Sequence, residues 1–128
     1  MLVAASPALA ADDFIEGVYL QSEELCKQVK KDTLQALIDA GNIVLSAHGL
    51  QGVEYNCEFV QISKATASPS WAVTAICQEP GYVFPDVLSV TQMNSKQIDL
   101  VSVRRIDSES EASGNSGSYY RCEGIALP

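Results

Sequence analysis

Four cysteines, Cys26, Cys57, Cys77 and Cys122, constrain the fold of this chain more than any other feature. No two of them have the C-x-x-C spacing that zinc ribbons and redox motifs require. An even number of widely spaced cysteines is typical of exported domains that form disulfides. We therefore expect two disulfides, either Cys57–Cys77 with Cys26–Cys122, or Cys26–Cys57 with Cys77–Cys122.

Two segments with period-two alternation carry the central pair of cysteines. In VEYNCEFVQI (53–62) the residues Val53, Tyr55, Cys57 and Phe59 share one face, and in WAVTAICQE (71–79) Cys77 lies on the apolar face. If the two segments form a hairpin, the two cysteines lie opposite each other at a distance that a disulfide can bridge. This register favours the Cys57–Cys77 pairing, but spacing alone does not exclude the rival pairing.

One helix and five further strands complete the predicted order of elements. Residues 22–41 read as a single helix, with Ser22 as N-cap and Gly41 at its C-terminal end. Its expected apolar stripe consists of Leu25, Val29, Ala36 and Ala40, with Leu37 beside it. The other strands are expected at 13–20, 42–49, 82–93, 97–106 and 119–127, with LQG (50–52) as a turn.

This order predicts an α+β fold that is mainly antiparallel β. There is no βαβ alternation, so a parallel sheet is not expected. Consecutive short strands with tight turns favour a small meander barrel or a curled sheet of about seven strands, with one N-terminal helix packed on it. We expect a single domain over residues 11–128.

The first ten residues, MLVAASPALA, look like the remnant of a signal peptide. Ala8 and Ala10 form an A-x-A cleavage pattern after an apolar run, although the basic segment that normally precedes it is missing. The run is too short to span a bilayer. Together with the cysteines, it predicts a periplasmic or secreted protein.

The charge balance narrows the class of partner. The chain has 16 acidic and 8 basic side chains and a net charge of −8. Nucleic acids and anionic membranes require clustered Lys and Arg, so neither is an expected partner. An acidic surface suits a cationic protein partner.

No constellation for catalysis is present. His48 is the single histidine, no G-x-S-x-G elbow occurs, and no glycine-rich phosphate loop is found. Glu109 and Glu111 lie in the acidic Ser/Gly-rich loop 107–118, where a raised pKa is not expected. We therefore predict no enzymatic activity, no cofactor and no metal site.

Two segments carry surface features that suit contact with a partner. GYVFPDV (81–87) presents Tyr82 and Phe84 around a proline, and SYYRC (118–122) lies beside the acidic loop. The second segment places Tyr119, Tyr120 and Arg121 together, and Tyr and Arg are frequent interface anchors. Alternation requires one of the two tyrosines to face the core if the strand is half-buried.

The general plan resembles the periplasmic and membrane-bound inhibitors of c-type lysozyme. SEASGNSGSYY (110–120) is similar to the loop that those small barrels insert into the lysozyme cleft, in containing Ser113, Gly114 and a later tyrosine. The spacing differs, the loop lies nearer the C-terminus, and the Y-x-C of the family's first strand is missing.

The predicted function is accordingly a non-catalytic binding or inhibitor module that recognises a protein through its loops. Two alternatives are a structural protein of the envelope and a barrel that binds a small ligand in its interior.

Overall fold

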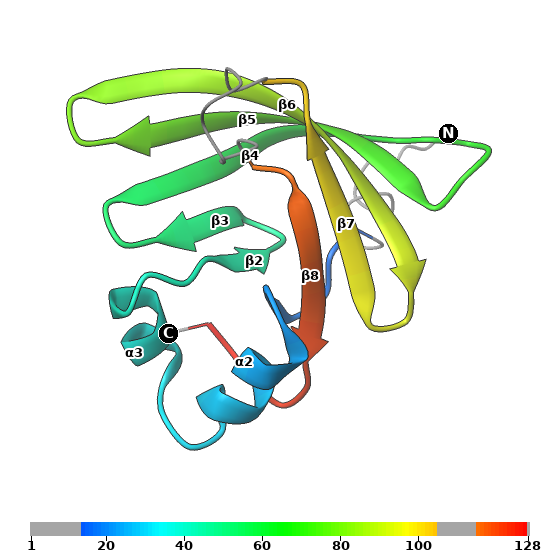
Figure 1. The fold of residues 1–128 in the computed structure, drawn as a ribbon. Coiled ribbons are helices and arrows are strands. Elements are labelled where there is room, and N and C mark those ends of the chain that lie inside the picture. The colour runs from blue at the N-terminus through cyan, green and yellow to red at the C-terminus, as the bar shows by residue number, and fades with distance from the viewer. Residues whose placement is uncertain (1–13, 105–114, 128) are drawn as a thin grey trace, which may run out of the picture.

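The computed structural model describes residues 14–104 and 115–127, in which eight strands form a closed antiparallel barrel (Figure 1). Neighbours in sequence are neighbours in the barrel, and the last strand closes onto the first. The strands are β1 (Val18–Leu20), β2 (Val44–Ser46), β3 (Gly49–Gly52), β4 (Tyr55–Lys64), β5 (Ser70–Glu79), β6 (Tyr82–Asn94), β7 (Gln97–Ser102) and β8 (Gly117–Cys122).

The antiparallel barrel is confirmed, but the strand count is eight rather than seven. The extra strand arises because the segment predicted as strand 42–49 and turn 50–52 is a hairpin, β2–β3, that turns at Ala47 and His48. Gly49 follows this turn with a φ of 142°, and a Cβ there would lie 1.8 Å from the Cys57 carbonyl oxygen. A glycine is therefore required where β3 approaches β4.

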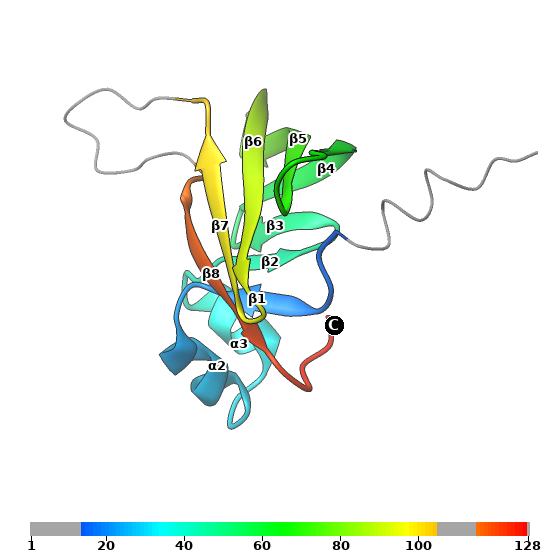
Figure 2. The same cartoon turned by 90° about the vertical axis from the view of Figure 1, so that its right-hand side faces the viewer.

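The predicted single helix is wrong, because two short helices occupy its range. They are α2 (Glu23–Val29) and α3 (Leu34–Asp39), and they lie at one end of the barrel, α2 against β1 and β8 and α3 near β3 (Figures 1 and 2). Ser22 caps α2 as expected, and Thr33 caps α3 by accepting a hydrogen bond from the Ala36 N–H at 3.0 Å.

This break changes the phase of the apolar stripe in the second half of the predicted helix. Leu34, Leu37 and Ile38 are buried, whereas Ala36 and Ala40 are exposed. A continuous helix would have placed the two alanines inward.

The expected pairing of the cysteines is observed, with disulfides between Cys57 and Cys77 and between Cys26 and Cys122. Cys57 and Cys77 are directly opposed in the β4–β5 register. A bulge between Phe59 and Gln61 then shifts the rest of the hairpin by one residue. The second disulfide ties α2 to the end of β8.

Two apolar clusters meet at β1. Tyr19 faces the barrel interior, whereas Val18 and Leu20 face the helices, and all three are buried. Inside the barrel, Trp71, Val73, Ala75 and Cys77 of β5 are buried as the alternation predicted. Val53 is 52 % exposed instead, since it belongs to the β3–β4 turn and not to the strand. Side chains thus fill the interior.

Candidate functional site

The outward face of β6 and β7 carries five exposed apolar residues. We call Val83, Pro85, Val87, Val101 and Val103 the valine patch.

The patch is continuous across the two strands, which lie side by side in Figure 2. Val87 and Val103 are linked by a backbone hydrogen bond of 3.0 Å, and Ser89 pairs with Val101. The four valines are 41–65 % exposed. No charged side chain belongs to the patch, although the chain as a whole has a net charge of −8. A contiguous exposed apolar area of this kind is a feature of surfaces that bind a partner.

A buried polar network lies directly behind the valine patch. The Asp86 carboxylate accepts hydrogen bonds from the Ser102 hydroxyl and from the Asn115 side-chain amide, each at 2.7 Å. Asp86 precedes Val87, and Ser102 lies between Val101 and Val103. The network therefore fixes the inward residues that alternate with the exposed valines, and it holds Asn115 against β6.

The same network continues to the first disulfide. The Tyr55 hydroxyl donates to the Asn115 side-chain oxygen, and it lies 3.3 Å from the sulfur of Cys57. Burial raises the pKa of Tyr55, and the nearby charges of Asp86 and Glu79 raise it further. Tyr55 is thus favoured as the neutral donor in this network.

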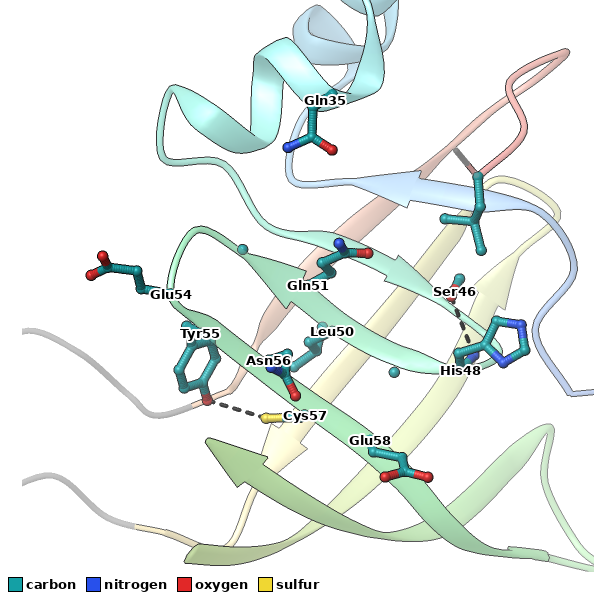
Figure 3. Close-up of a pocket in the computed structure, with 13 residues that line it drawn as sticks. Gln35, Ser46, His48, Leu50, Gln51, Glu54, Tyr55, Asn56, Cys57 and Glu58 are labelled. Atoms are coloured by element: carbon teal, nitrogen blue, oxygen red, sulfur yellow. Dashed lines mark hydrogen bonds between the residues drawn. The ribbon is translucent and has the colours of Figure 1, made fainter. Parts of the chain in front are cut away.

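A polar hollow of about 520 Å³ lies on the outside of β3 and β4. Figure 3 shows Gln51, Asn56 and Glu58 on its floor, with Glu54 at the turn between the strands. Gln35 of α3 borders it from the other side. We call it the first hollow.

A second hollow, of about 430 Å³, shares Glu54 and Asn56 with the first. The β5–β6 turn supplies its other wall, with Glu79, Tyr82 and Val83. Among the described residues that line the two hollows there are three glutamates and neither Lys nor Arg. Because Val83 belongs to the valine patch as well, an acidic depression borders the apolar area.

The backbone of Glu54 stands out at the point where the hollows meet. Its φ is 55°, in the left-handed region that favours glycine or asparagine. The two-residue turn between Gly52 and Tyr55 imposes this conformation. The turn places Glu54 where the two hollows meet.

The sequence-predicted partner residues of β8 do not form one surface. Tyr119 is 4 % exposed and lies in the barrel core, where burial raises its pKa to about 12. Tyr120 and Arg121 are partly exposed on β8, which lies between β1 and β7, away from the hollows. Ser113, Gly114, Glu109, Glu111 and the signal-peptide remnant 1–10 lie outside the described residues.

His48 borders the first hollow from the β2–β3 turn. Its backbone N–H donates to the Ser46 hydroxyl at 3.2 Å. Within residues 14–104 and 115–127, no group of three or more His, Cys, Asp or Glu side chains could hold a metal ion. None of the helices in that part of the chain has the length and apolar character to cross a membrane.

The sequence indicated 81–87 as a surface feature, but it predicted neither the valine patch that β6 forms with β7 nor the hollows. A signal for the patch was present, since Val83, Val87 and Val101 occupy the face opposite the buried positions of their strands. The second hollow had a partial signal, because the predicted β4–β5 register brings Glu54 and Glu79 to the same end of that hairpin, but this consequence was not predicted.

Comparison with protein-family models, with curated proteins and with solved structures finds no match for this chain.

Proposed function

We propose that the chain is a non-catalytic binding module, periplasmic or secreted, that recognises a basic protein. One observation carries the proposal: an uncharged apolar patch is bordered by an acidic depression on a rigid barrel. An apolar centre with a polar rim is the usual anatomy of a protein interface. The two disulfides support the oxidising compartment.

The charge of the partner follows from complementarity. The hollows gather three of the carboxylates of a chain whose net charge is −8. A basic protein would be steered toward this surface, and ionic strength would weaken the encounter. The strands and turns of the described chain supply this surface. Most of the acidic loop 107–118 lies outside the described residues, so a contact through that loop stays a prediction.

A c-type lysozyme is the first partner to test, because it is basic and because the general plan resembles that of its inhibitors. The oxidised protein is immobilised, and binding of lysozyme and of a panel of other basic envelope and host proteins is measured at low and physiological salt. We expect at least one micromolar or tighter complex that weakens as salt rises. The proposal is wrong if no basic protein binds at micromolar concentration.

A pair of valine substitutions tests whether the patch makes the contact. Val101→Lys introduces a positive charge into the valine patch and should weaken binding by about ten-fold or more. Val60→Lys is the matched control, because Val60 is 52 % exposed and Val101 58 % exposed, and Val60 lies at the β4 bulge outside the patch. Equal effects of the two substitutions would exclude the patch as the interface.

A further inference from the structure

The second hollow has an aromatic wall in addition to its two carboxylates. Tyr82 lines it and is 53 % exposed. The Tyr82 ring stacks on the Phe84 ring, with centroids 5.3 Å apart and ring planes 29° apart. Stacking restricts the ring, so Tyr82 presents a fixed aromatic surface to the hollow.

The same aromatic pair already supports a cation within the chain. The guanidinium carbon of Arg104 lies 4.2 Å from the centre of the Phe84 ring. This distance is well within the range of a cation–π contact. One ring of the pair, Phe84, thus already carries a guanidinium, while Tyr82 is exposed beside it.

Two glutamates line the hollow beside Tyr82. Glu54 lies in the β3–β4 turn, and Glu79 is the last residue of β5 and pairs with Tyr82 across the β5–β6 hairpin. Asn56 between them offers a neutral acceptor. An arginine is suited to this combination, because its planar guanidinium can stack on an aromatic ring and donate to carboxylates at the same time.

We propose that the second hollow binds the side chain of an arginine of the partner, stacked on Tyr82 and paired with Glu54 and Glu79. The inference rests on the proposed function for the identity of the partner as a basic protein. Beyond the proposed function, the inference specifies that the partner contributes an arginine and that the second hollow holds it. Arginine is favoured over lysine because an ammonium cannot stack as a plane or form a two-pronged contact.

The test uses small probes, so it does not depend on knowing the partner. The amide resonances of the labelled protein are followed during titration with N-acetyl-arginine amide, N-acetyl-lysine amide and the neutral isostere N-acetyl-citrulline amide. We expect millimolar binding of the arginine probe, weaker binding of the lysine probe and none of citrulline. The shifts should centre on Glu54, Asn56, Glu79 and Tyr82. Equal shifts from arginine and citrulline, or shifts elsewhere, would overturn the proposal.

Three substitutions separate the contributions to the site. Glu79→Gln and Tyr82→Leu should each weaken the arginine probe by about three-fold, whereas Tyr82→Phe keeps the ring and should retain most of the affinity. Glu58→Gln is the matched control, because Glu58 lines the first hollow and not the second. A loss with Glu58→Gln as large as that with Glu79→Gln would indicate non-specific attraction to negative charge, and the arginine site would be wrong.

The outcomes also separate this inference from the proposed function. Val101→Lys should leave binding of the arginine probe unchanged, while it weakens a protein partner. If the probe fails but Val101 is needed for the partner, the proposed function stands and the arginine site is wrong. If the probe binds but no basic protein does, the hollow binds arginine and the protein-binding function is wrong.

Discussion

Glu54 illustrates how a single residue can serve a surface at a cost in stability. Among the described non-glycine residues it alone has a φ in the left-handed region, at 55°. Such a conformation costs an ordinary residue about 1–2 kcal/mol. The negative charge at the shared rim of the hollows is a reason for keeping Glu there in place of glycine.

Glu54→Gly should therefore leave the free energy of unfolding unchanged or raise it by up to about 1 kcal/mol, since relief of strain offsets the greater flexibility of the unfolded chain. Glu58→Gly is the control, with the same loss of charge from the extended backbone of β4. It should cost about 1 kcal/mol. Urea unfolding measures both values, and similar losses for the two variants would contradict strain at Glu54.

Tyr119 gives a pH dependence whose sign follows from its burial. Its pKa is about 12 in the folded chain and near 10 when exposed, so the folded state retains the proton over that interval. The stability that this provides, about 3 kcal/mol, is fully present below pH 10 and is lost as the pH rises toward 12. Tyr55, whose pKa is also raised, contributes in the same direction.

Tyr119→Phe should remove most of this alkaline loss. The measurement is the unfolding midpoint in denaturant at a series of pH values from neutral to strongly alkaline, for the wild type and the variant. We expect the wild-type midpoint to fall relative to that of the variant as the pH rises from 10 to 12, with Tyr55 accounting for the slope that remains in the variant. If the two curves stay parallel over the whole range, the pKa of Tyr119 is not raised in the folded chain.

At the scale of elements, β6 and β7 are joined by more than their backbone ladder. Asp86 on β6 links the Ser102 hydroxyl at the end of β7 with the amide of Asn115, so one carboxylate serves three segments. Buried polar groups of this kind stabilise only when every partner is present. This dependence should make the position of the valine patch sensitive to Asp86.

Asp86→Ala should lower the free energy of unfolding by about 3 kcal/mol, because the buried Asn115 amide and the partly buried Ser102 hydroxyl lose their acceptor. Asp99→Ala is a matched control on the outward face of β7, where Asp99 is only partly buried and bonds Ser118. It should cost about 1 kcal/mol. Chemical denaturation measures the free energy of unfolding of both variants. Equal losses would show that the Asp86 network stabilises the fold no more than an ordinary surface hydrogen bond does.

The elements also show what local pattern can and cannot predict. The Cys57–Cys77 contact was predictable, because side-chain alternation and the polar loop between the strands together define the register of the hairpin. The β2–β3 turn was not predicted, since Ala47 and His48 are not typical turn residues. The helix break was missed because Thr33 competes as an N-cap within a segment that is otherwise helical.

The candidate site was less accessible to prediction than the fold. Its two hollows depend on which turns meet in space, and that depends on the register of four consecutive strands. The prediction for SYYRC was incomplete for a related reason. Strand alternation required one of its two tyrosines to be buried, and only the structure identifies that residue as Tyr119. Exposure on a strand follows from register, which sequence spacing alone does not give.

For the molecule as a whole, the two disulfides differ in accessibility. Cys57 and Cys77 are 2 % and 0 % exposed inside the barrel, whereas Cys26 is partly exposed on α2. Thiol exchange requires access to a sulfur atom. Cys26–Cys122 also joins residues 96 positions apart, so its loss should cost about 5 kcal/mol in the chain-entropy model.

Mild reduction of the native protein should therefore open Cys26–Cys122 first. Alkylation followed by peptide mass mapping should find label on Cys26 and Cys122 while Cys57 and Cys77 remain bonded, and this intermediate should unfold at a lower temperature. Label appearing first on Cys57 and Cys77 would show that the barrel opens more readily than the contact between α2 and β8.

The Cys26–Cys122 bridge also sets the path that a tensile force would take through the molecule. A pull on the two ends of the described chain would pass from Phe14 to Cys26, cross the bridge, and leave through the residues after Cys122. Only β1 lies wholly on this load path, and β2 to β7 belong to the part of the chain that the force bypasses. In a molecule held at both ends, the force would pull β1 away from the barrel, while β6 and β7, which carry most of the valine patch, would bear no load.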